Sequence, residues 1–424
     1  MARNPGPRPA HTDGPQQAAG PEARVVVVGA GHGGAALVAL LRQGGHRGEI
    51  VLIGDEPEHP YQRPPLSKKF TSGELEQVIR PREFYAEQQV VLQLGERVTG
   101  LDAAAQKLTT TSGGTFGYDF LVLATGARPR PLPAPGANLD GVAALRTLAD
   151  ARVLRDWLAE RRRLVIVGAG YIGLEVAAVA TAAGVPVTVL EREERVLNRV
   201  ASSELSAILT AAHGARGVDI RVDAQVCALA GNGAVREVVL GSGGTLPADG
   251  VLVGIGAIPN TELAEAAGLA CAGGIVVDET ARTSDPAVLA IGDATVRPVA
   301  GVGRMRLESI PSATEQAKQA AATILGTPPP APELPWFWSD QLDLKLKIAG
   351  VVLPGREVVL RGDPGIGRFA LFHLERGQVR AVETANSPAE FMAGKKLIAS
   401  GVLVDPVRLA DPAVPLRDVS TGAC

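Results

Sequence analysis

The chain has 424 residues, too many for one ordinary domain, so we expect two or three domains. Its net charge of −3 provides no general basic field, which argues against nucleic acid or an anionic membrane surface as a partner. Hydrophobic residues make up 46% of the chain and supply an ample core, but no apolar run is long enough to span a bilayer.

The cysteines and the N-terminal segment favour a cytoplasmic protein. Cys227, Cys271 and Cys424 lie far apart, without the spacing of a zinc site or an iron–sulfur cluster, so we expect reduced thiols and no bound metal. Residues 1–23 are rich in Pro, Gly, Ala and Gln and contain no hydrophobic segment of the secretory kind. We expect them to form a disordered tail.

A glycine-rich turn follows the first hydrophobic strand, which we expect at 24–28. Glycines let the backbone approach a pyrophosphate, and the helix after the turn offers unpaired N–H groups and a positive dipole end. The next strand, at 49–53, ends near an acid that can bind ribose hydroxyls. The residues of this candidate dinucleotide site are Gly29, Gly31, Gly33, Gly34 and Asp55.

The same plan occurs again after an apolar strand at 120–124 and a proline-rich connector at 129–135. A strand at 164–167 leads into a second glycine turn, and a strand at 187–190 ends at an acid. The turn glycines are Gly168, Gly170 and Gly173, and the acid is Glu191. Either fingerprint alone is weak evidence, but two in one chain predict two dinucleotide sites.

Glu191 favours NADH over NADPH, because its carboxylate accepts hydrogen bonds from ribose hydroxyls and repels a 2′-phosphate. Arg192 and Arg195 are close in the sequence, and either can in principle pair with such a phosphate. The alternative is that both arginines are ordinary solvated surface residues.

The last part of the chain first returns to the strand-and-turn pattern. A strand at 288–291 stops at a turn that contains Asp293, and a helix at 311–325 begins with a proline in its first turn. From Trp336 onward short alternating strands predict a smaller α+β domain with an antiparallel sheet.

Alternating side chains along 339–348 separate an apolar face from a basic face. The apolar residues are Leu342, Leu344, Leu346 and Ile348, and the basic residues are Lys345 and Lys347, which Arg306 and Lys318 join if the fold brings them together. Such a patch would steer an acidic iron–sulfur protein through a transient, salt-sensitive interface. The alternative is an ordinary solvated strand face.

Five segments together resemble the FAD-dependent NADH:ferredoxin reductases of oxygenase systems. These segments are Tyr61 to Lys68, Ala124 to Gly126, Gly168 to Glu175, Thr283 to Asp293 and Pro335 to Gln341. The resemblance implies an α/β fold like that of glutathione reductase, with two Rossmann-like dinucleotide-binding domains, for FAD and NAD, and a C-terminal α+β domain. The expected FAD-binding domain comprises 24–127 and 256–333 around an NAD-binding domain at 128–255, and a C-terminal interface domain covers 334–424.

The resemblance also implies roles for particular residues. In the FAD site, Asp55 would bind the adenosine ribose, Asp293 the ribitol chain, and Lys68 would lie beside the flavin near N5. The rest of that site would be Val98, Arg146, Ile310 through its backbone amide, and Trp338, which also lies near the docking surface. The NAD site would comprise Gly168, Gly170, Tyr171, Ile172, Gly173, Glu175, Glu191 and Gly256.

Lys68 and Glu175 are the expected catalytic pair. Glu175 lies two residues past the last glycine of the second turn, where a carboxylate close to apolar packing needs a partner. The pair would orient nicotinamide and flavin for direct hydride transfer. The alternative is that Glu175 only interacts with the helix dipole.

No cysteine precedes Cys227, so the chain lacks the redox-active cysteine pair that related disulfide reductases carry near the position of Lys68. We therefore expect an enzyme that transfers a hydride from NADH to FAD and then single electrons to a 2Fe-2S ferredoxin, which feeds a haem-thiolate monooxygenase. The nearest alternatives are the reductase of a Rieske dioxygenase or rubredoxin system. A different class is an NADH-switched flavoprotein of the apoptosis-inducing-factor kind.

Overall fold

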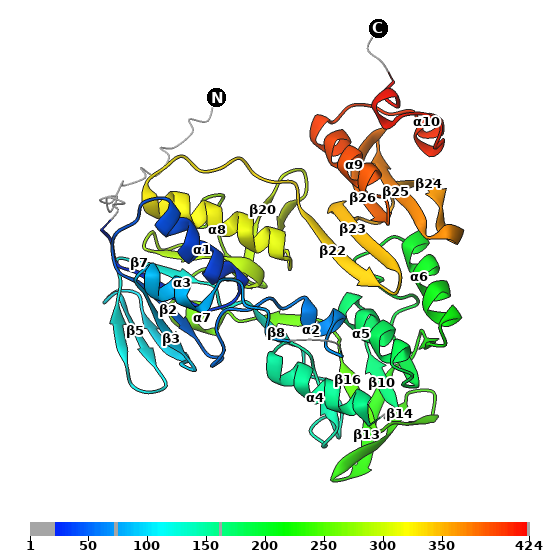
Figure 1. Ribbon diagram of the computed structural model, residues 1–424, viewed down its shortest axis with the longest axis horizontal. Coiled ribbons are helices and arrows are strands. Elements are labelled where there is room, and N and C mark those ends of the chain that lie inside the picture. The colour runs from blue at the N-terminus through cyan, green and yellow to red at the C-terminus, as the bar shows by residue number, and fades with distance from the viewer. Residues whose placement is uncertain (1–21, 72–74, 161–162, 422–424) are drawn as a thin grey trace, which may run out of the picture.

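The computed structural model describes residues 22–71, 75–160 and 163–421. It contains two α/β units and a smaller C-terminal unit, which lies at the upper right in Figure 1. The expected tail, residues 1–23, lies outside the described residues except for Glu22 and Ala23. No helix in the described ranges is long and apolar enough to cross a membrane.

The first unit is built on a five-stranded parallel sheet with the order β19-β7-β1-β2-β3. These strands are β1 (Val25–Val28), β2 (Ile50–Gly54), β3 (Val90–Leu94), β7 (Phe120–Leu123) and β19 (Val288–Ala290). Every residue of β1 is buried, as expected for a central strand covered on both faces. Because β19 joins this sheet after the chain has formed the second unit, the first unit is discontinuous in sequence.

Alternate side chains of β1 enter two different cores. Val25 and Val27 pack with helices α1 (His32–Gln43) and α8 (Ile310–Leu325) on one face of the sheet. Val26 and Val28 face a second core, which includes residues of a three-stranded antiparallel sheet and a short helix. These elements are β4 (Val98–Asp102), β5 (Lys107–Thr110), β6 (Thr115–Gly117) and α7 (Glu262–Ala266). The period-two burial thus fixes which side of the sheet each layer covers.

The second unit repeats this plan with the strand order β12-β11-β10-β16-β9. Its strands are β9 (Val142–Ala143), β10 (Leu164–Val167), β11 (Val187–Leu190), β12 (Asp219–Arg221) and β16 (Gly250–Val253). One face packs against α4 (Leu148–Ala159), α5 (Tyr171–Ala182) and α6 (Ser203–Ala215). The other face packs against β13 (Val226–Asn232), β14 (Ala234–Leu240) and β15 (Thr245–Pro247).

Two short strands connect the units. β8 (Ala127–Pro129) leaves the first unit and β17 (Ala257–Pro259) returns to it, and the two pair with each other in an antiparallel ribbon. The boundaries expected at 127/128 and 255/256 fall in or beside this ribbon. These boundaries and the one at 333/334 stay predictions.

The C-terminal unit contains a five-stranded antiparallel sheet with the order β22-β23-β26-β25-β24. Its strands are β22 (Trp336–Gln341), β23 (Leu344–Gly350), β24 (Glu357–Asp363), β25 (Arg368–Glu375) and β26 (Gln378–Ala385), and α9 (Pro388–Ser400) covers one face. On the other face, Leu344, Leu346 and Ile348 share a core with α5 and α6 of the second unit.

The predicted position of Leu342 is wrong. Leu344, Leu346 and Ile348 are buried and Lys345 and Lys347 are exposed, as the alternation predicts. Leu342, however, lies in the turn between β22 and β23 with a φ of 56°. A tight hairpin turn needs a residue in the left-handed region, so the strand alternation starts only after the turn.

The remaining described elements are short. They are α2 (Pro65–Lys68), α3 (Arg82–Glu87), β18 (Ile275–Val276), β20 (Thr295–Val299), β21 (Gly303–Met305), α10 (Pro406–Ala410) and the 3-10 turns Gly292–Ala294, Pro364–Ile366 and Leu416–Asp418. Helix α8 begins at Ile310, one residue before the expected start, because Ser309 caps it through a hydrogen bond from the Ser312 amide.

Candidate active site

The first glycine turn packs backbone against backbone and leaves one side open. A Cβ on Gly29 would lie 2.1 Å from the Ala124 carbonyl oxygen, and one on Gly34 would lie 2.1 Å from the Gly29 carbonyl oxygen. At Gly31, the residue before α1, no described atom lies within 4 Å of where a Cβ would be. An open glycine at a helix N-terminus fits a pyrophosphate, which the helix's unpaired N–H groups and dipole attract.

Two further residues of this turn, Gly33 and His32, differ in their surroundings. Gly33 faces Ile291, whose Cδ1 would lie 3.4 Å from an added Cβ, so this glycine lets α1 pack closely. His32 Nδ1 is buried without a hydrogen-bond partner among the described residues, and burial lowers the pKa of this imidazole. The turn therefore presents an unsatisfied polar atom next to the helix N-terminus.

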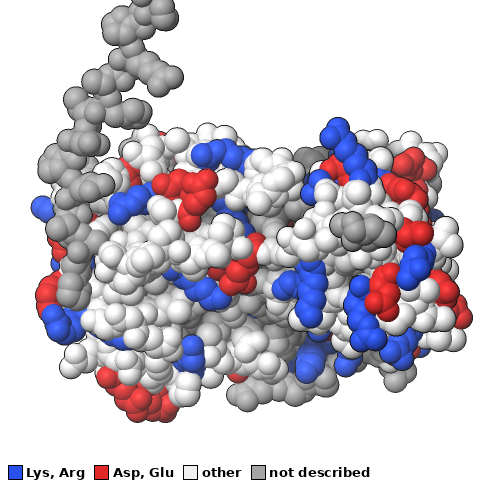
Figure 2. All heavy atoms as spheres, turned by 90° about the horizontal axis from the view of Figure 1, so that it is seen from above, with Lys and Arg blue, Asp and Glu red and all other residues white. Residues whose placement is uncertain are grey.

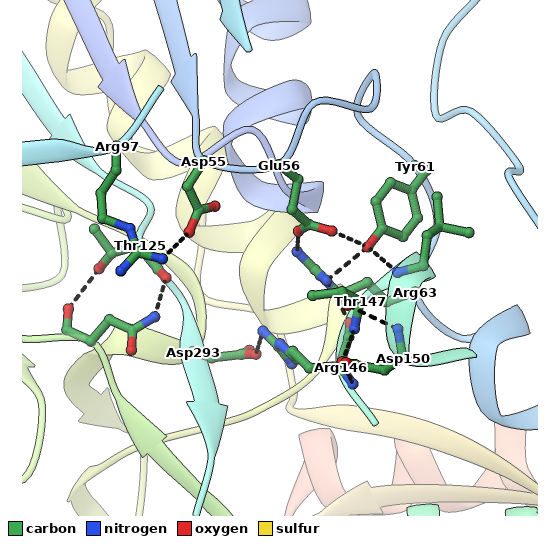
Figure 3. A network of polar contacts seen from close by, with 12 residues as sticks. Asp55, Glu56, Tyr61, Arg63, Arg97, Thr125, Arg146, Thr147, Asp150 and Asp293 are labelled. Carbon is green, nitrogen blue, oxygen red and sulfur yellow. Dashed lines mark hydrogen bonds and ion pairs between the residues drawn. The ribbon is translucent and has the colours of Figure 1, made fainter. Parts of the chain in front are cut away.

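Asp55 lies just past the carboxyl end of β2, where a ribose-binding acid is expected. Its side chain is 55% exposed and accepts a 3.2 Å hydrogen bond from Arg97 (Figure 3). Val98, the next residue along, is buried at the start of β4. Asp55 is thus available to a ligand, with Arg97 as a neighbour that the sequence did not single out.

Asp293 and Arg146 are 147 positions apart in the sequence, but their side chains are in contact. Arg146 donates a 3.1 Å hydrogen bond to Asp293, which lies in the 3-10 turn after β19 (Figure 3). The backbone of Arg146 is held from both sides, because its N–H donates to Asp150 at 2.9 Å and its carbonyl accepts from Arg63 at 2.6 Å. The guanidinium and carboxylate expected beside the flavin therefore lie together.

The segment from Glu56 to Lys68 is anchored by its own polar contacts. Arg63 donates to Glu56 at 2.6 Å, and the Tyr61 hydroxyl donates to the same carboxylate at 2.5 Å while accepting from the Leu148 amide. Burial is the main cause that raises the pKa of Tyr61, and the hydrogen bond to Glu56 raises it further. The phenol therefore stays neutral. These contacts fix the position from which α2 carries Lys68 toward the second unit.

The second glycine turn has the same construction. A Cβ on Gly168 would lie 2.5 Å from the Gly254 carbonyl oxygen, and one on Gly173 would lie 2.4 Å from the Gly168 carbonyl oxygen. Gly170 precedes α5 with extended backbone, and the nearest described atom would be 3.9 Å from its added Cβ. Gly256, with a φ of 104°, lies past β16 at the same end of the sheet.

Glu191 is held against this turn. Its carboxylate accepts a 2.7 Å hydrogen bond from the Ala169 amide and a 3.0 Å hydrogen bond from the Glu193 amide. The Arg195 guanidinium is already engaged by oxygen atoms of Asn198, Ala201, Ser202 and Ser206. Arg192 is exposed and pairs with Glu193. Of the two arginines that could attract a 2′-phosphate, only Arg192 keeps its guanidinium at the surface.

Three units converge on Glu175, a buried residue of α5. Its side chain is 5% exposed, and its carboxylate forms an ion pair with Lys68 of α2. Ser67 and Ser339 each donate a 2.5 Å hydrogen bond to the same carboxylate, the latter from β22 of the C-terminal unit. A buried carboxylate needs such partners. The structure thus brings the expected Lys68 and Glu175 together and adds two serines that the sequence did not indicate.

The start of α5 borders a small cleft between the first and second units. Ile172 is 48% exposed and lines it together with Arg146 and residues of the α2 segment. Tyr171 instead packs edge-on against Phe337, with 5.1 Å between ring centroids, and burial raises the pKa of its phenol well above the usual value. One cleft therefore joins Arg146 of the first site to Ile172 of the second.

The expected docking residues divide into two sets. On the C-terminal sheet, Trp338 lies opposite Lys347, whose Nζ is 5.5 Å from the Phe391 ring centroid. Arg306 and Lys318 are each neutralised by a nearby carboxylate, of Glu308 and Glu333 respectively. Figure 2 shows the molecule from above. Lys and Arg side chains gather on the half that contains the C-terminal unit, with acidic side chains among them.

The described residues contain no group of three or more His, Cys, Asp or Glu side chains that could hold a metal ion. Cys227 is exposed and Cys271 half-buried, and both are free thiols, while Cys424 lies outside the described residues.

Comparison with known proteins identifies the family. The pyridine nucleotide-disulphide oxidoreductase family matches residues 23–317, well over half of the chain, and the reductase C-terminal family matches residues 336–420. The chain belongs to the pyridine nucleotide-disulphide oxidoreductase family. This reductase is an FAD-dependent enzyme that uses NAD(H), and its expected fold class is confirmed.

Relatives along nearly the whole chain are ferredoxin reductases. The reductase is 46% identical over 397 residues to the probable ferredoxin reductase CtmF of Castellaniella defragrans, covering 92% of this chain and 97% of the relative. It is 41% identical to putidaredoxin reductase CamA of Pseudomonas putida, covering 94% and 97% of the two chains. The crystal structure of a covalent putidaredoxin reductase–putidaredoxin complex matches with a TM-score of 0.90 and 40% identity, covering 94% of this chain and 98% of that one. The expected resemblance is therefore confirmed.

Proposed function

We propose that this reductase transfers a hydride from NADH to FAD and passes single electrons to a 2Fe-2S ferredoxin that serves an oxygenase. The observation that carries this proposal is the convergence on Glu175. Ser67 and Lys68 of the first unit and Ser339 of the C-terminal unit all donate to this carboxylate, which belongs to the second unit. A donor site, a cofactor site and an acceptor face must meet at one place for such a transfer, and the meeting of the three units at Glu175 supports this proposal.

The first unit would hold FAD. The open turn at Gly31 fits the pyrophosphate, Asp55 would accept hydrogen bonds from the adenosine ribose, and Asp293 with Arg146 would hold the ribitol chain. Lys68 would lie beside the flavin, and the Ile310 amide at the start of α8 would face the pyrimidine edge. When bound, FAD supplies the ability to take two electrons together and release them singly.

The second unit would hold NADH. The turn at Gly170 is open to a pyrophosphate, and Glu191 is already oriented toward that turn by two backbone amides. Its fixed negative charge favours ribose hydroxyls over a 2′-phosphate, so we expect NADH to be the preferred donor. Ile172 and Gly256 would border the nicotinamide end of this site.

Lys68 and Glu175 would act as the catalytic pair between the two sites. The carboxylate is buried and receives three donors, so it has one well-defined orientation. It in turn fixes the Lys68 ammonium. We propose that this rigid pair aligns the nicotinamide with the flavin, because hydride transfer requires close and precise approach.

The acceptor would dock on the C-terminal unit. Lys345 and Lys347 are exposed beside Trp338 on one face of the sheet, and positive side chains attract an acidic partner. Because Arg306 and Lys318 already have carboxylate partners, we expect them to contribute less. We propose a haem-thiolate monooxygenase as the terminal oxygenase and a cytoplasmic location, where NADH is supplied.

The decisive experiment is an anaerobic two-step assay. The FAD-loaded protein should be bleached rapidly by NADH and slowly by NADPH, and should then reduce a 2Fe-2S ferredoxin at a rate that falls steeply with salt. A panel of ferredoxins from monooxygenase, Rieske dioxygenase and rubredoxin systems would identify the cognate acceptor. Slow bleaching with a long-lived NADH complex would contradict the proposal and favour an NADH-switched flavoprotein.

A further inference from the structure

Lys68 lies between two carboxylates, only one of which has a place in the function proposed above. It forms an ion pair with Glu175, and its Nζ lies 3.8 Å from Oδ2 of Asp340. The Lys68 side chain is 11% exposed and that of Asp340 44% exposed. Asp340 therefore extends from solvent to a nearly buried ammonium group.

Two acidic side chains lie within ion-pair distance of Lys68. Two carboxylates face one ammonium, and Ser67 and Ser339 contribute hydrogen bonds to Glu175 but no charge. Lys68 is nearly buried and Asp340 is partly solvated, so their attraction is screened by water on the Asp340 side only in part. Asp340 thus adds negative potential at the group expected beside the flavin.

The strand that carries Asp340 links this point to the proposed docking face. Ser339 and Gln341 point toward the second unit, where Ser339 reaches Glu175 and Gln341 contacts His213. Asp340 belongs to the opposite face of β22 and lies directly across from Lys345 of β23. Directly opposite residues in an antiparallel pair are close enough for their side chains to interact. Asp340 therefore has an exposed cation on one side and Lys68 on the other.

We propose that Asp340 is a positioning residue that couples the docking face to Lys68. This inference rests on the proposed function, because it requires FAD beside Lys68. When no partner is bound, the attraction between Lys345 and Asp340 weakens the electrostatic interaction of Asp340 with Lys68. An acidic partner that pairs with Lys345 releases Asp340 toward Lys68. The added negative potential then disfavours reduced flavin, so acceptor docking promotes electron release.

The test measures the oxidation–reduction equilibrium of bound FAD against a reference dye, without NADH or ferredoxin. Asp340→Asn keeps the shape and removes the charge, so we expect reduced flavin to be favoured by about three- to tenfold. Asp340→Glu should restore the original equilibrium. The matched control is Asp343→Asn, in the turn of the same hairpin, where Asp343 is 77% exposed and pairs with Arg216. It should leave the equilibrium unchanged.

A second variant tests the coupling. Lys345→Gln should shift the equilibrium toward oxidised flavin by about two- to threefold, and this shift should disappear when combined with Asp340→Asn. A shift that persists in the double variant would overturn the coupling through Asp340. An equilibrium in Asp340→Asn that matches that of Asp343→Asn would overturn the whole inference.

Failure of this inference can be distinguished from failure of the proposed function. Unaltered protein that NADH does not bleach, or that does not reduce ferredoxin, contradicts the function whatever Asp340→Asn does. Unaltered protein that passes both steps while Asp340→Asn behaves like its control contradicts only the role of Asp340. FAD content and thermal unfolding of each variant show that it is folded.

Discussion

The two glycine turns have nearly the same backbone, but the acids that accompany them differ. Asp55 is 55% exposed and contacts only the Arg97 side chain in the described hydrogen bonds, whereas Glu191 is held by two backbone amides. A group fixed before binding loses less conformational entropy when the ligand arrives. This matters most for a ligand that exchanges at every turnover, as NADH would. A resident cofactor that binds once can itself order the Asp55 side chain.

The largest effect is expected when a side chain is added to the first glycine of either glycine turn. Gly29→Ala and Gly168→Ala each place a Cβ within 2.5 Å of a carbonyl oxygen at a positive φ, which costs at least about 2 kcal/mol of folding free energy. Gly29→Ala should purify without FAD, whereas Gly168→Ala should remain yellow but fail to be bleached by NADH. FAD absorbance and anaerobic reduction measure both. Loss of FAD from Gly168→Ala would show that the two turns are not independent sites.

The next largest effect concerns the point where the two units meet. Glu175→Gln keeps the shape of the side chain but removes the charge that fixes Lys68, so we expect flavin reduction by NADH to slow by about 100-fold. Stopped-flow absorbance measures this rate. Glu204→Gln is the matched control, since Glu204 likewise lies near the start of a helix but is exposed on α6. If NADH reduces the flavin equally fast in both variants, Glu175 has no role in hydride transfer.

A smaller effect is expected when the charge of either ribose-binding acid, Glu191 or Asp55, is removed. Glu191→Gln loses charge-assisted hydrogen bonds to the ribose, so the KM for NADH should rise by about 10- to 100-fold and the preference over NADPH should narrow. Asp55→Asn should leave the KM for NADH unchanged and weaken FAD binding by only several-fold. Steady-state assays and FAD titration of the apoprotein give these values. An equal rise in KM from Asp55→Asn would contradict the assignment of the two sites.

Local patterns predicted the parts of this molecule that depend on neighbouring residues. The apolar strands and glycine turns repeat with short, regular spacing, so both nucleotide-binding units were visible in the sequence. Even the alternation of β23 was correct from Leu344 onward, and only the turn residue Leu342 was misplaced. Its φ depends on how the hairpin closes, which hydrophobic alternation does not reveal.

Contacts between distant segments could not be predicted in this way. Ser339 is 164 positions from Glu175, and a serine hydroxyl has no periodic pattern that would mark it as a partner. The Arg63 contact with the Arg146 carbonyl depends on how the α2 segment folds over α4. The resemblance suggested that Lys68 and Glu175 belong to one site, but the two serines and Asp340 that surround them required the packed structure.

The smallest expected effect tests whether Glu191 alone sets the preference for NADH over NADPH. Arg192 is 78% exposed and pairs with Glu193, and an exposed pair of this kind contributes at most about 1 kcal/mol. Arg192→Ala should therefore change the NADH-to-NADPH ratio of kcat/KM by less than about twofold. Arg195→Ala should leave that ratio unchanged and lower the thermal unfolding temperature, because it removes contacts to four residues. A tenfold loss of NADPH activity in Arg192→Ala would mean that this arginine attracts the 2′-phosphate against the repulsion of Glu191. The selectivity of the second site would then reflect two opposing charges instead of one preorganised acid.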